Sequence, residues 1–382
     1  MLVSYISIFL ATACVDRFYH DIDKTANRGI SITGHISDQS GPYEVRVYSV
    51  FDIESKESQR VPVSVKQLTL SDSEGKVEIL SEIDKGIYRT SPLGIKGVVG
   101  GVYKLTVELL DGGLYESMPD TILAPSPMDS MYLQFNQSYN SVGKKEYTFD
   151  VFFDATIRQG VNNRLMWKFT GTFQAETHPE SPAGGCIFLA EISQCNFVPA
   201  CSGYRNVGTN ARPVLEQKFP CTCCTCWYNL HNDYPILSDD QFSMSGKLEG
   251  VKIYSVPLNE WTLWHRIRVE VAQRSLTNNS FKFFKAIRDQ KDAIGNLFQP
   301  ISGRIPNAFV QLSGPKSSIE GIFFATSISK KVKYVQRFGS LPNIGVPPNF
   351  STAISSDEPF AINDCRLKFP NSTNIKPAFW ED

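Results

Sequence analysis

Residues 63–75, VSVKQLTLSDSEG, hold the pattern that decides the fold of this chain. Apolar and polar side chains alternate along residues 63–70, as they do in a β-strand that has one face in a core and the other in solvent. The polar run that follows ends at Gly75, and glycine readily takes the positive φ that a tight hairpin turn requires. The stretch therefore predicts a half-buried strand that ends in a hairpin turn.

Segments of the same kind lie on both sides of this stretch. They are short runs of alternating apolar residues separated by glycine-containing turns, which is typical of an antiparallel β-sandwich. The residues from 29 to 127 are therefore predicted to form such a sandwich. The runs are residues 30–33, 45–50, 77–80, 86–89, 102–109 and 114–117, with a turn at 111–113.

A proline-rich segment, PDTILAPSP at residues 119–127, predicts a semi-rigid linker, because proline cannot donate a hydrogen bond to a β-ladder. One helix is predicted near residues 278–294, where Phe283, Ile287 and Ile294 are apolar. Thr277 or Asn278 can cap its start, and Gly295 can end it. We therefore predict that residues 128–382 form a larger antiparallel β-rich domain with this one amphipathic helix. Its strands are expected at residues 132–135, 147–153, 165–173, 250–256, 264–273, 322–325 and 332–335.

The chain starts with an apolar run that is too short to cross a bilayer as a helix. Residues 2–10 have the length of a signal-peptide core, and the small residues 11–13 lead to Cys14, an arrangement that fits a lipoprotein signal peptidase. Residues 1–13 are therefore predicted to be a lipoprotein signal peptide, Cys14 to carry the lipid, and residues 14–28 to form a polar tether. The alternative is a buried N-terminal strand with an ordinary cysteine.

Eight further cysteines lie between residues 186 and 365, and their even number fits a set of disulfides in an oxidising compartment. Residues 221–226, CTCCTC, contain two overlapping Cys-x-x-Cys spacings, so a metal site held by thiolates is the alternative. Adjacent Cys223 and Cys224 are expected to pair elsewhere, because a bridge between neighbours strains the peptide. The predicted disulfide cysteines are Cys186, Cys195, Cys201, Cys221, Cys223, Cys224, Cys226 and Cys365.

The composition favours a folded protein of two domains, with 382 residues of which 42% are hydrophobic. The net charge is −1 and the basic residues are scattered, which argues against nucleic acid as a partner. None of the common catalytic or phosphate-binding motifs is present, and the five His are widely separated. We assign no catalytic, cofactor-binding or metal-binding residue and do not expect an enzyme. Trp261 and Trp264 would contact a sugar or a partner protein if exposed, and belong to the core if buried.

Several short pieces, taken in their order, resemble a family of Bacteroidota outer-membrane lipoproteins, the domain of unknown function 4249. The resemblance covers nearly the whole chain. Besides Cys14, the pieces are residues 32–34, 62–63, 72–75, 86–88, 101–103, 111–113 with Tyr115 and Ser117, Pro127, Asp129, 226–227, 273–277 (QRSLT), 295–298 and 321–323.

This resemblance implies a lipid-anchored outer-membrane protein, exposed at the cell surface, that acts as a binding accessory of a TonB-dependent transporter in nutrient capture. It also implies an immunoglobulin-like or prealbumin-like N-terminal sandwich, no enzymatic activity and no cofactor, and it leaves the ligand open. The alternative is a structural or adhesive envelope lipoprotein without a role in transport. An enzyme would require a polar cleft formed by carboxylates or His in the second domain.

Overall fold

The structure is a computed structural model. It describes residues 29–49, 61–156, 164–177, 187–189, 192–194, 199–208, 214–232, 234, 236–238, 247–258, 261–262, 266–293, 305–315, 319–336 and 364–380. The predicted signal peptide, Cys14 and the tether 14–28 lie outside these ranges. Within them, no helix is both long enough and apolar enough to cross a membrane.

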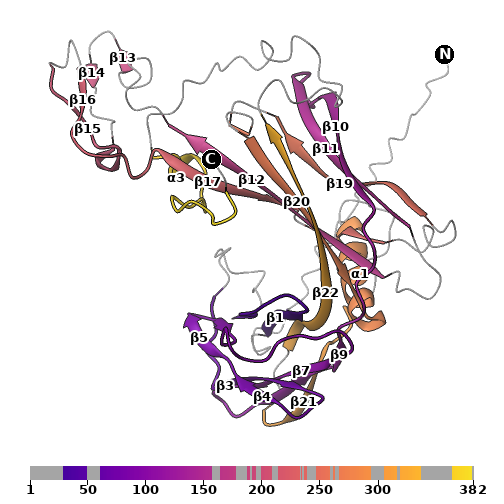
Figure 1. The fold of residues 1–382 in the computed structure, drawn as a ribbon. Helices are drawn as coiled ribbons and strands as arrows, with labels where there is room; N and C mark the ends of the chain where they lie inside the picture. The colour runs from indigo at the N-terminus through magenta and orange to yellow at the C-terminus, as the bar shows by residue number, and fades with distance from the viewer. Residues whose placement is uncertain are drawn as a thin grey trace, which may run out of the picture.

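Two sheets pack face to face around the core of the N-terminal region (Figure 1). The first contains β1 (Ile30–Ser37), β2 (Glu44–Ser49), β6 (Ile87–Arg89) and β5 (Ser81–Asp84), in that order. The second has the order β21 (Phe309–Ser313), β8 (Leu114–Ser117), β7 (Val102–Glu108), β3 (Gln67–Asp72) and β4 (Val77–Ile79), and β9 (Asp120–Thr121) pairs with β7. The predicted sandwich is present, and its core includes Ile32, Val47, Leu68, Leu105 and Val107.

The hairpin turn predicted from residues 63–75 is confirmed, but its first strand is β3 at Gln67–Asp72 and not residues 63–70. Leu68 and Leu70 of β3 are buried, β3 pairs antiparallel with β4, and Gly75 in the turn has a φ of 86°. The turn between β7 and β8 is built in the same way, with Gly112 also at a φ of 86°. Glycine takes these conformations without the steric penalty that a Cβ would bring.

The second part of the chain also packs two sheets together. One has the order β17 (Thr225–His231), β12 (Leu165–Glu176), β20 (Arg266–Ser275) and β22 (Ile319–Gln336), with β18 (Ile236–Leu237) beside β12. The other has the order β10 (Ser130–Tyr139), β11 (Lys145–Thr156) and β19 (Lys247–Pro257). Large side chains such as Phe149, Trp167 and Phe169 fill the space between them. Two small hairpins, β13 (Ile187–Leu189) with β14 (Ile192–Gln194) and β15 (Tyr204–Asn206) with β16 (Leu215–Gln217), complete the strands.

The long strand β22 joins the two parts into one nine-stranded sheet (Figure 1). Its first half pairs parallel with β1, and its second half pairs antiparallel with β20. Gly321 permits the close approach to β1, because its φ is 101° and a Cβ there would lie 2.1 Å from the carbonyl oxygen of Ile32. The sandwich predicted for residues 29–127 thus takes in β21 and part of β22, which cover the edges of β8 and β1.

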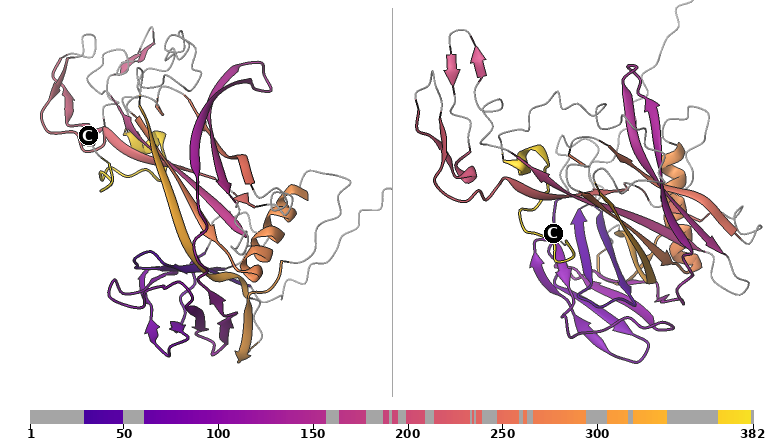
Figure 2. Two further views of the ribbon diagram at one scale, coloured as in Figure 1. Left: turned by 45° about the vertical axis from the view of Figure 1, so that its right-hand side comes forward. Right: turned by 45° about the horizontal axis from the view of Figure 1, so that its top comes forward.

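Helix α1 (Asn278–Ala293) matches the predicted helix closely, and the predicted stop at Gly295 lies outside the described residues. The Thr277 hydroxyl accepts a hydrogen bond from the Ser280 backbone N–H at 3.5 Å, so Thr277 is the cap. Phe281 and Phe283 pack with residues of β22 such as Phe324. In the left panel of Figure 2, α1 lies beside β22 where this strand approaches the sandwich.

A buried carboxylate fixes the start of α1 to the sheet. Asp120 accepts hydrogen bonds from the hydroxyls of Thr277 at 2.5 Å and Ser280 at 2.6 Å, and from the backbone N–H of Ala325 at 3.0 Å. These donors replace the water that the carboxylate loses on burial. The linker, the helix and β22 therefore meet at one side chain.

The proline-rich linker is bound to the second part along its length. The Gln273 amide donates to the carbonyl oxygen of Ser126 at 2.8 Å, and the Ser275 hydroxyl accepts from the Ser126 backbone N–H at 3.2 Å. Residues 120–121 of the predicted linker instead form β9, which pairs with β7 of the sandwich, and Ser126 is held by side chains of β20. The fixed position of the linker sets how the sandwich meets the sheet formed by β17, β12, β20 and β22, which we call the upper sheet.

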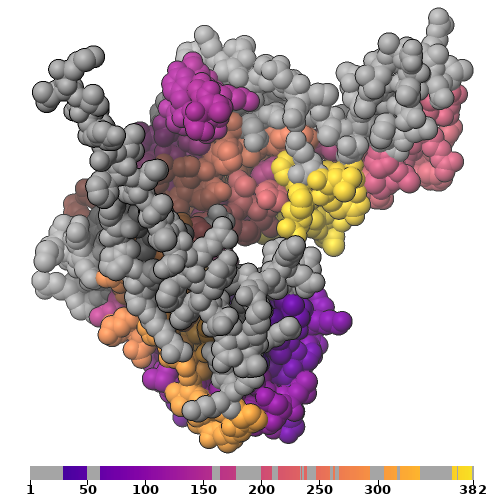
Figure 3. Space-filling view, turned by 180° about the vertical axis from the view of Figure 1, so that it is seen from behind, coloured from indigo at the N-terminus to yellow at the C-terminus, as the bar shows by residue number. Residues whose placement is uncertain are grey.

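The C-terminal segment, residues 364–380 with the short helix α3 (Cys365–Lys368), packs on the upper sheet. In the space-filling view it lies beside the region of β15 to β17 (Figure 3, yellow against pink). Phe369 contacts the ring of Trp261, with a centroid distance of 5.3 Å, and the Trp380 indole donates to Gln174 at 3.2 Å. Trp261 is buried, as its core interpretation requires, whereas Trp264 lies outside the described residues.

Candidate functional site

The cysteine-rich run 221–226 forms disulfides at the far end of the upper sheet. Three pairs are described: Cys201–Cys223, Cys221–Cys224 and Cys226–Cys365, with Cα–Cα distances of 5.6, 5.7 and 6.0 Å. Adjacent Cys223 and Cys224 pair with different partners, as predicted. Cys186 and Cys195 lie outside the described residues.

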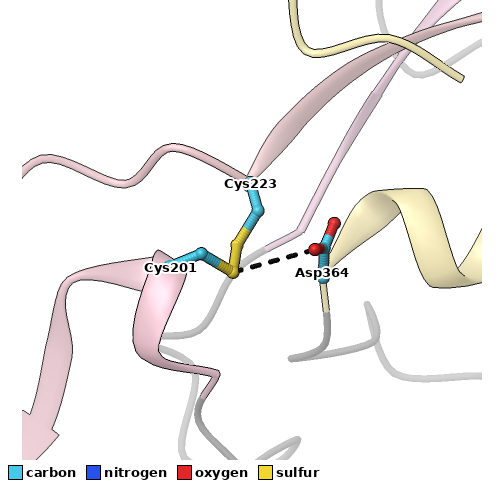
Figure 4. Close-up of side chains that lie close together, drawn as sticks. All are labelled: Cys201, Cys223 and Asp364. Carbon is cyan, nitrogen blue, oxygen red and sulfur yellow. Dashed lines mark hydrogen bonds between the residues drawn. A yellow bond between two sulfur atoms is a disulfide. The ribbon is translucent and has the colours of Figure 1, made fainter.

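The same geometry weakens the metal interpretation of this run. Cys201, Cys223 and Asp364 lie together, with the Cys201 sulfur 3.8 Å from an Asp364 oxygen (Figure 4). However, both sulfurs belong to a disulfide and offer no thiolate, which is the form of cysteine that binds zinc. Asp364 is engaged as well, because its hydrogen bonds to Arg366, the shortest of them 2.5 Å, lower the pKa of its carboxyl group. We therefore assign this cluster a structural role.

These bonds attach the C-terminal segment to β17. Cys226 of β17 is bonded to Cys365, and the backbones of Trp227 and Thr373 form an isolated bridge. Phe369, between these two attachments, inserts among the aromatic residues of the core. The cysteine-rich end thus secures a tail that has little regular structure of its own.

A cleft of about 930 Å³ lies instead at the junction of the two parts. Its floor is the sheet where β2, β1 and β22 run side by side, and its wall is α1 with residues 305–307. Because side chains alternate along a strand, one face of β1 carries Ser31, Thr33 and His35 into the cleft, while Ile32 and Ile36 point into the sandwich core.

One wall of the cleft is apolar and aromatic. Phe283, Phe284 and Ile287 come from α1, and Ile322 and Phe324 come from β22. The rings of Phe284 and Phe324 meet edge to face, with centroids 5.1 Å apart. These contacts keep the wall in place, since the same residues belong to the small core beneath the helix.

The opposite side of the cleft is polar and contains several charged residues. His35 stacks on Phe324, with ring centroids 5.4 Å apart, and Lys168 projects into the cleft from β12. Glu44 and Arg46 line the floor, and Arg46 donates to Glu44 at 2.6 Å. Arg274 does not line the cleft, but its guanidinium lies 5.8 Å from the Phe324 ring centroid.

Burial and neighbouring positive charges lower the pKa values of the basic groups beside the cleft. Burial, followed by the positive charges of Arg274 and Lys168, holds the pKa of His35 well below its ordinary value of 6.5. Loss of hydration, followed by the charges of Arg274 and Arg46, also lowers the pKa of Lys168, and burial lowers the pKa of Arg274 to about 10. At neutral pH, Arg274 is therefore charged and His35 is neutral.

The described lining offers no pair of groups arranged for acid–base or nucleophilic chemistry. The Glu44 carboxylate is occupied by Arg46 and also by Arg89, whose nearest nitrogen lies 2.8 Å away. His35 has a ring neighbour, and no described residue of the lining forms a hydrogen bond with its side chain. The geometry suits binding, because it combines an apolar wall with a few polar groups.

No sequence pattern predicted this cleft. His35 is one of five widely separated His, and the signal that the sequence offered is Lys168, a lysine inside the otherwise apolar strand of residues 165–169. Residues 273–277 indicated only the family resemblance. In the structure Gln273 and Ser275 hold the linker, Arg274 stands behind the cleft, and Thr277 caps α1.

Comparison with known proteins agrees with the resemblance seen in the sequence. The sequence model of one family, described as Domain of unknown function (DUF4249), matches residues 15–332. No curated protein matches the chain. The matched range runs from before β1 to the second half of β22, so it includes every strand that contributes to the cleft. The chain therefore belongs to the family with the domain of unknown function DUF4249.

Proposed function

We propose that this protein is a surface lipoprotein of the outer membrane that binds a small nutrient molecule as an accessory of a TonB-dependent transporter. The observation that carries the binding role is the cleft of about 930 Å³ at the junction. Small-molecule sites typically enclose roughly 300–1,000 Å³ and combine apolar walls with a few polar groups. The cleft has both properties.

The position of the cleft in the chain supports an anchored binding protein. The strand β1, whose residues Ser31 to His35 line the cleft, starts directly after the predicted tether 14–28. A flexible chain of this length spans roughly 20 Å on average. Lipid on Cys14 would then keep the cleft close to the membrane and to a transporter within it.

A binding role also agrees with the chemistry of the lining better than an enzymatic one. The carboxylate of Glu44 is held by two arginines, so it is not free to remove a proton. The His35 ring is stacked on Phe324, and no described residue of the lining orients it through a hydrogen bond as the partner of a catalytic base would. We therefore propose that the protein binds its ligand without converting it.

The accessory role is tested by affinity capture from detergent-solubilised outer membranes, with a tag at the C-terminus. We expect the tagged protein to copurify with a TonB-dependent transporter and its Cys14→Ser variant to appear in the soluble fraction. As a matched control, an unrelated lipoprotein signal with its own cysteine is fused to the Cys14→Ser protein, so that the lipid anchor is restored. Repeated capture of the anchored protein without any transporter would refute the accessory role.

One observation favours the structural or adhesive alternative. Apolar side chains are exposed along the outer edge strands of the sandwich, at Val77, Ile79 and Ile83. Such side chains occur where proteins attach to one another. Deletion of the protein that impairs attachment or envelope integrity and leaves nutrient uptake unchanged would support this alternative.

A further inference from the structure

Two cations beside the cleft, Lys168 and Arg274, form no salt bridge or side-chain hydrogen bond with any residue that the structure describes. The Arg274 Nε atom is buried without a partner among these residues. The partly buried Arg274 guanidinium would normally have a counter-charge, because taking a charge out of water is costly, whereas Lys168 is exposed and keeps contact with solvent. The protein therefore holds positive charge at this place that nothing in its own described residues balances.

The sheet register places these two cations side by side. Lys168 of β12 is opposite Ala272, and Arg274 of β20 is opposite Met166, so the two basic residues are diagonal neighbours on one face. The same face carries Phe324 of β22, over which the Arg274 guanidinium lies. Each cation lowers the proton affinity of His35, which confirms that their charges act on the same space.

The acidic residues of the cleft do not neutralise this charge. Glu44 is shared between Arg46 and Arg89, so its carboxylate is already engaged by two guanidinium groups and has no charge left to offset Lys168. Glu320 lines the cleft and is exposed to solvent, as Lys168 is, and the two form no salt bridge among the described residues. The positive charge beside the aromatic wall thus comes from Lys168, with Arg274 behind Phe324.

The apolar wall lies beside this positive end. Phe283, Phe284 and Ile287 of α1 line the same cleft as Lys168. A ligand that satisfies both features must join one negative group to an apolar or aromatic body. Small inorganic anions would leave the aromatic wall uncovered, and neutral apolar molecules would leave the cations without a partner.

We propose that the cleft binds an organic anion with an apolar body, whose anionic group contacts Lys168 and whose body lies against Phe283, Phe284 and Ile287. Arg274 acts as a positioning residue that strengthens the positive field from behind Phe324. This inference rests on the proposed binding function and names the class of ligand. It is independent of which transporter, if any, receives the ligand.

Isothermal titration calorimetry on the full chain with its disulfides intact tests the inference. The probes are naphthoate, which is an aromatic carboxylate, its neutral analogue naphthamide, and acetate, which has the anion without the aromatic body. We expect naphthoate to bind about tenfold tighter than naphthamide, since a charge-assisted contact is lost with the amide. Acetate should bind most weakly.

Three variants assign the two halves of the ligand to the two walls. Lys168→Met should weaken the binding of naphthoate about tenfold and leave the binding of naphthamide unchanged, because only the carboxylate contacts the positive charge. Phe284→Leu should weaken both aromatic probes by a similar factor. Lys66→Met, which removes an exposed lysine paired with Glu108 on the sandwich, is the matched control and should change neither.

A fourth variant should change the affinity for naphthoate in the opposite direction. This test does not depend on whether Lys168→Met folds correctly. Glu320→Gln removes the exposed carboxylate at the rim and should tighten naphthoate by about threefold at low salt, with no effect on naphthamide. Equal affinities for naphthoate and naphthamide, or Lys168→Met and Glu320→Gln variants that bind naphthoate like the unchanged protein, would overturn the inference. If naphthoate binds as expected and membrane capture recovers no transporter, the accessory role fails and the ligand class stands.

Discussion

The disulfide end of the upper sheet and the cleft at its opposite end differ in whether their charged side chains have partners of opposite charge. At the disulfide end, Asp364 holds Arg366. Midway along β20, Glu270 also holds both Arg268 at 2.6 Å and Lys330 at 3.6 Å. At the cleft, Lys168 and Arg274 have no such carboxylate among the described residues. Both ends belong to β12 and β20, so the contrast is not one of fold. A site whose charges are satisfied internally is built for stability, and a site whose charges are unsatisfied is available to a ligand.

The largest effect should come from removing the covalent attachment at the disulfide end. The paired substitution of Cys226 and Cys365 by Ser removes a bridge that joins residues 139 positions apart. We expect it to lower the free energy of unfolding by about 4 kcal/mol, as the loss of a bridge that closes a long loop typically does. Chemical denaturation followed by fluorescence measures the change. Naphthoate affinity at temperatures where the variant is folded should be unchanged, and a parallel loss of affinity would contradict the separation of the two ends.

A smaller loss of stability is expected where the cleft is held together without covalent bonds. Asp120→Ala would leave the hydroxyl of Ser280 and the backbone N–H of Ala325 buried without their acceptor. We expect the free energy of unfolding to fall by about 2–3 kcal/mol, the usual penalty of such orphaned groups. Unlike the loss of the disulfide, this change should also weaken naphthoate, because α1 would no longer be fixed to β22. Calorimetry alongside thermal unfolding distinguishes these results, and unchanged affinity would show that the cleft does not depend on this attachment.

The pH dependence of stability offers a third comparison. The pKa of His35 in the folded protein is well below 6.5, whereas the unfolded chain takes up a proton near 6.5. The unfolded state therefore binds more protons as the pH falls below about 6.5, and His35 destabilises the folded protein from there down to its folded pKa. His35→Gln removes this contribution. The free energy of unfolding of the unchanged protein, relative to that of the variant, should therefore decrease as the pH is lowered from about 7 to about 5. A difference that stays constant over this range in denaturant titrations would contradict the prediction.

The smallest effect on stability is expected from Lys168→Met, the substitution with the clearest expected effect on binding. Lys168 has no described partner to lose, so the free energy of unfolding should change by no more than about 0.5 kcal/mol. Thermal unfolding at low salt measures this, with Lys66→Met as the matched control. A large loss of stability would mean that Lys168 has a structural role, and the contrast between the two ends would then disappear.

Much of the fold could be predicted from local patterns. Alternation along residues 63–70 and the glycine at position 75 predicted β3 and its turn, and the apolar spacing after Thr277 predicted α1. The separation of Cys223 and Cys224 into different disulfides followed from peptide geometry. These features depend on neighbouring residues, whose period and conformational preferences are present in the sequence.

The candidate site depended on contacts between distant residues. The parallel pairing of β22 with β1 brings Phe324 to His35, and the pairing of β12 with β20 brings Lys168 to Arg274. No local pattern specifies which strand edges meet, because every strand offers the same backbone donors and acceptors. The sequence by itself therefore determined the β-rich class, the helix and the family. Only the tertiary structure decided which cations share a face and that they lie beside an aromatic wall, since both facts follow from strand register.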